Sequence, residues 1–232
     1  MTKIAAVPPA PPKRLYKLAA LGPGGEVLLD GKPARTRARR PLSAPSEALA
    51  RAIVGEWNAQ AEVIDFLSMP MTRFQMTVID RTEADAGAWR DAAIAFLKSD
   101  LLCYRADAPA ELAARQEAAW APLLSWAAGQ GVRLQTGSGV GFIDQPAAAI
   151  AAGAALIAAA PPAQRLAIKS AAEIAGSAVI ALAMWRRAFD VETLFEASRV
   201  DETFQAEKWG WDAEAETRAR QLKRDFLDVA RY

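Results

Sequence analysis

Residues 201–212 read Asp201-Glu202-Thr203-Phe204-Gln205-Ala206-Glu207-Lys208-Trp209-Gly210-Trp211-Asp212, and this stretch predicts a corner between two helices. Gly210 can adopt the left-handed backbone conformation that ends a helix. Asp212 is a good N-cap for a second helix, because its carboxylate can accept a hydrogen bond from a free backbone N–H in the first turn. Acidic residues open that second helix and basic residues follow, which suits the helix dipole. The corner therefore indicates a helical C-terminal region.

The side chains of the corner have more than one interpretation. Trp209 and Trp211 would pack in the core if the corner were only a structural element. Asp201, Gln205 and Lys208 recur at i, i+4 and i+7, which is typical of a solvated helix face, and nothing nearby completes a metal shell. An exposed acidic face beside tryptophan is also a common form of protein-binding surface. The residue pattern leaves the structural and the binding interpretations open.

Helical patterns extend from about Gln145 to the end of the chain. One long helix is predicted from its apolar face and from small residues that permit close packing; these residues are Ile168, Ala172, Ala175, Val179, Gly176 and Ser177. The apolar stretches 147–162 and 174–185 are shorter than the roughly 20 residues that a membrane span needs. Both are therefore interpreted as buried helices.

The N-terminal part mixes strands and helices. Residues 15–21 and 26–29 flank the hairpin signal Gly22-Pro23-Gly24-Gly25, and the tight-turn pair Asp30-Gly31 leads into a strand over 32–36. The apolar residues Leu49, Ile53 and Trp57 then recur at i, i+4 and i+8, which predicts an amphipathic helix over 46–60. Ser46 is its expected N-cap.

Further elements follow before the C-terminal region. Pro70 suits the first turn of a helix, and the pair Thr82 and Asp85 approximates a capping box that opens another helix reaching Leu97. Short strands are expected at 101–105 and 132–136, with a helix over 109–128 between them. No internal repeat is visible.

These patterns predict an α+β fold with a small N-terminal α/β domain, which contains a β-meander, and an all-helical C-terminal domain. We expect a disordered tail over residues 1–13, an N-terminal domain over 14–107 and a C-terminal domain over 108–232. The boundary lies somewhere in 80–108. At 232 residues the chain is long enough to bury a sizeable core.

Composition excludes several classes of chemistry. The chain contains no histidine, which removes the commonest general base, the Ser-His and Cys-His nucleophile pairs and the commonest metal ligand. The single cysteine, Cys103, permits neither an internal disulfide nor a Cys/His zinc site, and it lies in an apolar run typical of a core. The net charge of +1 predicts no nucleic-acid or membrane partner through bulk electrostatics. An enzyme is therefore disfavoured.

Two further motifs have ordinary explanations. The run Gly137-Ser138-Gly139-Val140-Gly141 lacks the spacing of a phosphate-binding loop, so it predicts a connection between two elements. The patch formed by Arg35, Arg37, Arg39 and Arg40 predicts a solvated strand edge that resists aggregation. An RNA-binding role for the patch is weak, because no aromatic residues interleave to stack bases.

Four stretches together resemble one family, the assembly chaperones that hold the alpha subunit of the ATP synthase catalytic head before it joins the alpha/beta hexamer. They are Val27-Leu28-Leu29-Asp30-Gly31-Lys32-Pro33, Glu56-Trp57-Asn58-Ala59-Gln60 followed by Met69-Pro70-Met71-Thr72, Asp100-Leu101-Leu102-Cys103-Tyr104-Arg105, and the corner 201–212. A block over 120–126 fits between them, although Ala121 stands where the family usually has aspartate. The resemblance runs from about residue 14 to 230, and the ordered set is specific.

The resemblance implies a C-terminal orthogonal helical bundle and a chaperone without ATPase activity, catalytic residues or cofactors. Its implied partner is the free alpha subunit, whose apolar surface it would cover until incorporation into the hexamer, because that surface would otherwise self-associate. We expect a monomer when free, with no nucleic-acid partner and no membrane insertion. The start of the chain lacks signal- or transit-peptide features, and arginine outnumbers lysine. Both favour a bacterial cytoplasm, or the mitochondrial matrix if the source is eukaryotic.

The resemblance also suggests site residues. Those that match the C-terminal signature of the family are Glu202, Gln205, Glu207, Trp209, Gly210 and Asp212, and Asp201 completes the predicted partner-binding set. Trp57, Tyr104 and Trp120 are expected to be structural. Two competing functions stay open: a small-molecule enzyme that uses the carboxylates of the corner, and an RNA-binding or scaffolding protein that uses the arginines at 35–40.

Overall fold

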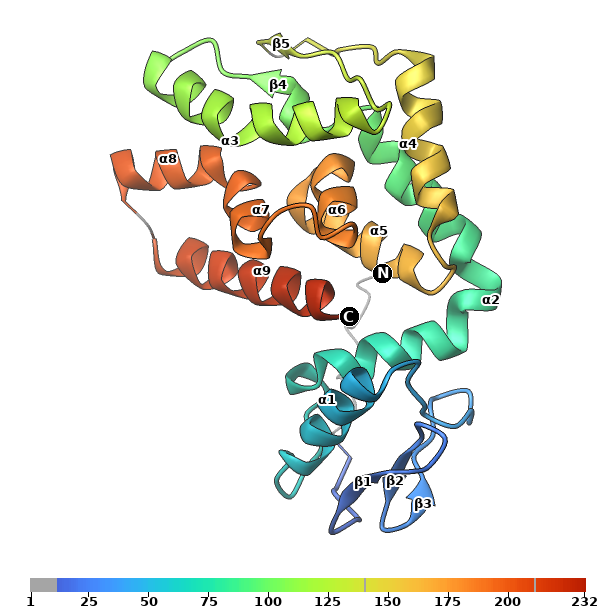
Figure 1. Cartoon of the computed structure of the whole chain (residues 1–232). Helices are drawn as coiled ribbons and strands as arrows, with labels where there is room; N and C mark the ends of the chain where they lie inside the picture. Colours follow the sequence, from blue (N-terminus) through green and yellow to red (C-terminus); the bar gives the residue numbers. More distant parts are fainter. Residues whose placement is uncertain (1–11, 140, 211) are drawn as a thin grey trace, which may run out of the picture. The chain divides into compact units, whose positions relative to one another are not determined.

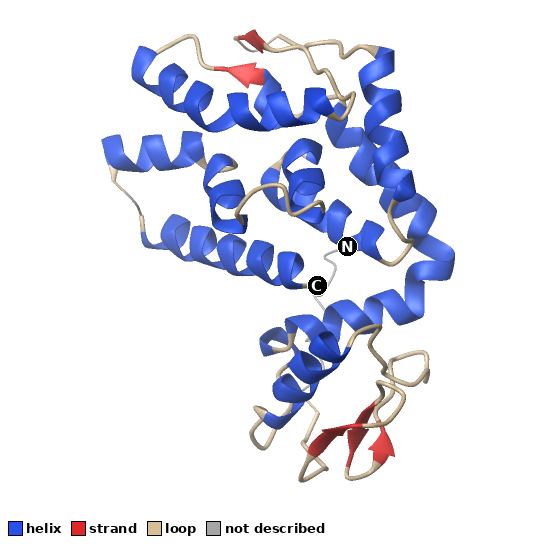
Figure 2. Cartoon of the chain, viewed as in Figure 1, coloured by secondary structure: helices blue, strands red, loops and turns tan. Residues whose placement is uncertain are grey.

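The structure, a computed structural model, describes residues 12–139, 141–210 and 212–232 (Figure 1). The described chain is mostly helical, with a three-stranded antiparallel sheet and a two-stranded parallel ladder (Figure 2). The predicted α+β class is confirmed. The chain divides into an N-terminal unit, residues 1–81, and a C-terminal unit, residues 82–232, at one end of the predicted boundary interval of 80–108.

The sheet of the N-terminal unit is the predicted meander, with β1 at Ala19–Leu21, β2 at Val27–Leu29 and β3 at Lys32–Pro33. Asp30 and Gly31 both have positive φ angles, 47° and 78°, as the two central residues of a tight hairpin turn require. The predicted strand over 32–36 is shorter in the structure and ends at Pro33. Most of the predicted tail, residues 1–11, lies outside the described residues. Pro12 and Lys13 are held against 63–64, because the Ile64 N–H donates to the Pro12 carbonyl at 2.8 Å.

The core of the N-terminal unit forms where α1, Glu47–Asn58, packs on β1 and β2. The predicted cap is confirmed, since the Ser46 side chain accepts a hydrogen bond from the Leu49 N–H. Trp57 is buried and makes edge-on ring contacts with Tyr16 and Phe66, at 5.6 and 6.3 Å between ring centroids. The structure therefore places Trp57 in a core, where the sequence pattern expects it.

The helix α2 runs without interruption from Pro70 to Leu97. It begins where the Glu56 carboxylate accepts hydrogen bonds from the Met71 and Thr72 N–H groups, both at 2.8 Å. Such a carboxylate satisfies free donors at a helix N-terminus and complements the helix dipole. The prediction of a second helix start near Thr82 is wrong, because local capping residues do not interrupt a helix whose backbone hydrogen bonds continue past them.

The C-terminal unit is built around α6, Ala178–Trp185, whose residues 178–184 are all buried. The single long helix predicted across 168–179 is wrong. Gly176 has a left-handed conformation, φ 68°, that ends α5, Gln164–Ala175, and the Ser177 side chain then caps α6. Asp100 is fully buried and accepts a hydrogen bond from the Val179 N–H at 3.0 Å. One carboxylate thus joins the end of α2 to the start of the central helix.

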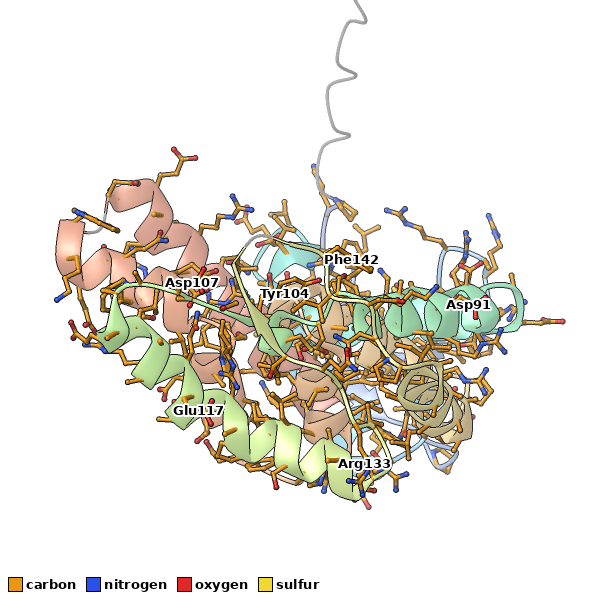
Figure 3. The ribbon with its side chains drawn as sticks, turned by 90° about the horizontal axis from the view of Figure 1, so that it is seen from above. Asp91, Tyr104, Asp107, Glu117, Arg133 and Phe142 are labelled. Carbon is orange, nitrogen blue, oxygen red and sulfur yellow. The ribbon has the colours of Figure 1, made fainter. Side chains whose placement is uncertain are left out.

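The two short strands predicted in this unit are displaced in the structure. Residues 101–103 form a 3-10 turn, and only β4, Tyr104–Arg105, is extended. Its parallel partner is β5, Gly137–Ser138, rather than residues 132–136. Tyr104 is half-buried, whereas Phe142, in the loop after β5, is 72% exposed (Figure 3).

Between these strands lies α3, Ala110–Gly129, which carries Trp120 into the core. The Trp120 ring is fully buried, its Nε1–H donates to the Ala197 carbonyl at 2.7 Å, and the Arg105 guanidinium lies 5.0 Å from the ring centroid. The remaining helices are α4 Ala147–Ala159, α7 Val191–Ala197, α8 Val200–Trp209 and α9 Ala213–Arg231. Among the described residues no helix combines the length and the apolar character that crossing a bilayer requires.

Candidate functional site

The candidate site is the corner formed by α8 and the start of α9, and α8 sorts its side chains into two stripes. Helical spacing places residues three and seven positions apart on one face. The inner stripe consists of Asp201, Phe204 and Lys208, on the side of α8 that packs against α3 (Figure 1). The outer stripe consists of Glu202, Gln205 and Trp209, all of which are exposed. The two stripes have different partners and therefore different roles.

The inner stripe attaches α8 to α3. Phe204 is 3% exposed, and Asp201 accepts a hydrogen bond from the buried Gln116 Nε2 at 2.7 Å. The Gln116 Oε1 in turn accepts from the Ala106 N–H at 2.8 Å, just after β4. Asp201 is thus half-buried, and one of its carboxylate oxygens bonds to the buried Gln116.

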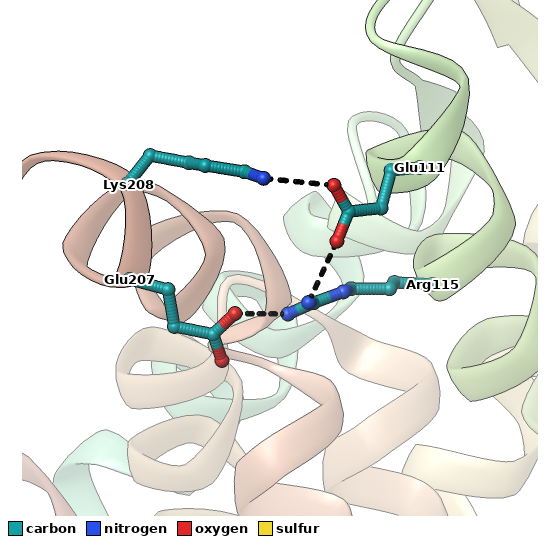
Figure 4. A network of polar contacts seen from close by, with 4 residues as sticks. All are labelled: Glu111, Arg115, Glu207 and Lys208. Carbon is teal, nitrogen blue, oxygen red and sulfur yellow. Dashed lines mark hydrogen bonds and ion pairs between the residues drawn. The ribbon is translucent and has the colours of Figure 1, made fainter.

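Four charged side chains continue this attachment at the solvent edge (Figure 4). Arg115 on α3 pairs with Glu207 at 2.6 Å and with Glu111 at 3.0 Å, and Lys208 pairs with the same Glu111 at 2.9 Å. The hydrogen bond from Lys208 lowers the pKa of Glu111, and the hydrogen bond to Glu207 raises the pKa of Arg115. Exposed pairs contribute little one at a time, but a linked network with charges of alternating sign orients the helix.

The outer stripe lies on the face of α8 next to the inner stripe and is exposed. Trp209 is 78% exposed, which is unusual for the residue type with the largest apolar ring system. Gln205 is exposed and makes no hydrogen bond within the described part of the chain. Glu202 pairs with Arg199 one turn earlier, at 3.0 Å, and its side chain keeps 52% of its surface exposed. The interpretation of Trp209 as a core residue is therefore wrong, whereas Trp211 lies outside the described residues.

The backbone of the corner forms only in part as the local sequence predicts, because α8 ends before Gly210 but Gly210, with ψ 160°, is not in the left-handed helical conformation. Gly210 has φ 85°, a conformation that side chains disfavour, and its N–H donates to the Ala206 carbonyl at 2.8 Å. Asp212 caps α9 by accepting a hydrogen bond from the Ala215 N–H at 2.8 Å. Gly210 and Asp212 therefore fix where α8 ends and α9 begins.

The corner offers recognition chemistry rather than reaction chemistry. Among the described residues no group of three or more His, Cys, Asp or Glu side chains is arranged to hold a metal ion. Two of the corner carboxylates, those of Asp201 and Glu207, are engaged by Gln116 and Arg115. What stays available is an apolar ring beside an amide and a partly exposed carboxylate, a combination typical of protein interfaces.

Sequence reasoning missed the residues of α3 that hold the corner. Arg115 and Glu111 lie about 90 residues before their partners, and no local pattern links sites so far apart. One signal was present: Gln116 is a polar residue on the apolar face of its predicted helix, and a buried amide needs partners. That requirement points to a distant acceptor, which the structure shows to be Asp201.

Comparisons with known proteins agree over most of the chain. A family model described as ATP12 chaperone protein matches residues 13–128. The crystal structure of Atp12 from Paracoccus denitrificans is similar, with 36% sequence identity, coverage of 95% of this chain and 96% of that chain, and a TM-score of 0.88. An aspartate-to-lysine variant of the Paracoccus protein gives the same values. A protein from Agrobacterium tumefaciens described as a chaperone is 40% identical, with 94% of this chain and 85% of that chain covered and a TM-score of 0.85.

Proposed function

This chain belongs to the ATP12 chaperone family, non-enzymatic factors that assist F1-ATPase assembly, and we propose that it binds the free alpha subunit of ATP synthase. In this role it covers an apolar surface of the alpha subunit and prevents its aggregation before incorporation into the alpha/beta hexamer. The free chaperone acts as a monomer. Its location is the bacterial cytoplasm, or the mitochondrial matrix if the source is eukaryotic.

The observation that carries this proposal is the outer stripe of α8. An exposed tryptophan offers a large apolar contact area, and tryptophan is enriched among residues that dominate binding energy. Trp209 is 78% exposed and is flanked along the same face by Gln205 and Glu202. The amide and the carboxylate give the apolar contact direction and specificity. We therefore assign partner contact to Glu202, Gln205 and Trp209.

The other residues of the predicted set support the helix that carries these three. Asp201 and Glu207 bond to Gln116 and Arg115 and so hold the helix on α3. Gly210 and Asp212 fix where α8 ends and α9 begins. This division of roles matters for experiments, because changes in the inner stripe alter the support of the surface rather than the surface itself.

A turbidity assay tests the proposed function. Free alpha subunit is diluted from denaturant with and without an equimolar amount of the chaperone, and labelled ATP is titrated separately into the pure chaperone. We expect suppressed turbidity and no ATP binding by the chaperone. Trp209→Ser should lose most of the suppression, because it removes the apolar anchor. Phe142→Ser is the matched control, since Phe142 is also a highly exposed aromatic, at 72%, but lies after β5.

The outcomes are distinct. Unchanged turbidity with wild-type chaperone would refute binding to the alpha subunit. If Trp209→Ser and Phe142→Ser lost the suppression of turbidity equally, the loss would not be specific to the α8 surface. Co-purification of a metabolite rather than the alpha subunit with tagged chaperone would favour a small-molecule function instead.

A further inference from the structure

The loop of residues 35–40, here called the arginine loop, is a closed and ordered hairpin tip in the N-terminal unit. The Leu42 N–H donates to the Ala34 carbonyl at 2.8 Å, and Arg35 bridges Pro41 in antiparallel fashion. Nearer the tip, the Thr36 N–H donates to the Arg40 carbonyl at 2.9 Å. The backbone of the loop is therefore fixed by its own hydrogen bonds.

Asp80 on α2 holds the arginine loop in place through two hydrogen bonds. Its Oδ1 accepts a hydrogen bond from the Thr36 hydroxyl at 2.6 Å, and its Oδ2 lies 3.2 Å from the Ala38 N–H, which donates to it. The Arg40 guanidinium donates to the Ile79 carbonyl at 2.8 Å. A carboxylate that satisfies both a buried hydroxyl and a backbone N–H holds the tip in one conformation. A strand edge that only faces solvent does not require the hydrogen bonds that Asp80 makes to this loop.

Three of the guanidinium groups on this fixed loop have no acidic partner among the described residues. Arg35, Arg37 and Arg39 are exposed, and none of these three pairs with a carboxylate in the described part of the chain. Arg35 donates only to the Arg39 carbonyl, at 2.8 Å. Arg39 has φ 61°, a left-handed conformation that is uncommon for a residue with a side chain. Three exposed guanidinium groups thus lie within five residues of one another, on a loop that includes a disfavoured backbone conformation.

The N-terminal unit carries a net positive charge. Residues 12–81 contain 11 lysine and arginine residues against 7 aspartate and glutamate residues, a net charge of +4, although the whole chain carries only +1. The positive charge is therefore concentrated in the N-terminal unit, with four of its arginines within six residues. Such local charge steers an oppositely charged partner.

We propose that the arginine loop binds a carboxylate-rich segment of a protein partner. Under the proposed function this partner is the alpha subunit, so the identity of the partner rests on that function. All four cations are arginine, whose planar fork matches a carboxylate through two parallel hydrogen bonds. Simple attraction to an anionic membrane does not need arginine rather than lysine. The loop also contains no aromatic residue on which a nucleic-acid base could stack.

The test measures the affinity of the chaperone for free alpha subunit at several salt concentrations. Two double variants are compared: Arg37→Gln with Arg39→Gln, which removes charge, and Arg37→Lys with Arg39→Lys, which keeps it. Lys13→Gln with Arg73→Gln is the matched control, because it removes two exposed positive charges from the same unit that form no ion pair in the described part of the chain. Thermal melting of each variant verifies that the fold is intact.

We expect the glutamine pair to weaken binding about tenfold at low salt, with a smaller difference at high salt where charges are screened. The lysine pair should restore only part of the affinity, and the control should match wild type. Equal affinities for wild type and the glutamine pair would overturn the proposal while leaving the proposed function standing. Failure of wild-type chaperone to bind the alpha subunit would overturn both. Full restoration by lysine, or loop-dependent binding to anionic vesicles or single-stranded RNA in place of the alpha subunit, would also overturn it.

Discussion

Replacing Trp57 with arginine removes a large buried ring from the N-terminal core and puts a charge in its place. Trp57 is only 5% exposed and contacts the rings of Tyr16 and Phe66. Truncation of a buried tryptophan costs about 3–5 kcal/mol, and burial of an unpaired charge adds more. A loss of at least about 5 kcal/mol is comparable to the whole stability of many domains. We therefore expect Trp57→Arg to unfold the N-terminal unit.

Trp57→Phe is the informative control. The Trp57 Nε1 is buried without a hydrogen-bond partner in the described structure, so phenylalanine forfeits ring volume but no polar contact. Its cost should be about 1–2 kcal/mol. Urea denaturation followed by circular dichroism separates the two variants. A Trp57→Arg chain that unfolds at the wild-type midpoint, yet no longer binds the alpha subunit, would refute the reasoning and move Trp57 into the interface.

Two further predictions concern the C-terminal unit. Burial raises the pKa of Asp100 to about 6, from an ordinary value of 3.8, despite hydrogen bonds from Ser177, Val179 and Leu102 that oppose the shift. Because the folded state then holds this proton more tightly, the stability that Asp100 contributes is fully present below pH 3.8 and is lost as the pH rises through about 6. The wild-type free energy of unfolding minus that of Asp100→Asn should fall by up to about 3 kcal/mol between pH 4 and pH 7, and a constant difference would contradict the assignment. Glu207→Lys should lower the melting temperature slightly by placing a cation beside Arg115, and adding Arg115→Glu should restore it; an unchanged melting temperature with binding abolished would instead make Glu207 a contact residue.

Local sequence was sufficient for elements whose signals lie within a few residues of one another. The turn at Asp30-Gly31 and the caps at Ser46 and Asp212 formed as predicted, because each depends on one residue's backbone preference or on a nearby N–H. Gly210 follows the end of α8 as predicted, but with ψ 160° rather than in the left-handed helical conformation. Gly176 shows the limit of this reasoning. The same residue type permits close packing and ends helices, and only the surrounding hydrogen bonds decide between the two.

Contacts between residues distant in the sequence determine the features that local sequence did not predict. The parallel partner of β4 lies at 137–138 rather than at 132–136. The pairing depends on which residues the chain brings back to β4 more than 30 residues later, and no local pattern determines this. The corner acids Asp201 and Glu207 are indistinguishable in sequence from Glu202, yet the first two contact Gln116 and Arg115 on α3, whereas Glu202 pairs with Arg199 one turn earlier in the chain. The family signature therefore does not distinguish the residues that attach α8 to α3 from those proposed to contact the partner.

The most direct test of the account measures the dissociation constant for the alpha subunit with Glu202→Lys and with its matched control, Glu216→Lys. Both glutamates are about half exposed, at 52% and 53%, and both pair with an arginine within one turn of their own helix. Both changes place a cation beside an arginine and should lower the melting temperature slightly, Glu202→Lys more than Glu216→Lys, because the Arg199 side chain is 19% exposed and that of Arg220 is 64% exposed. Both affinities are therefore measured at a temperature at which thermal melting shows each variant to be folded. We predict at least about tenfold weaker binding for Glu202→Lys and wild-type binding for Glu216→Lys, because a reversed charge inside an interface can cost several kcal/mol. Equal affinities for the two variants, with both folded, would contradict the assignment of the α8 outer stripe as the surface that holds the alpha subunit.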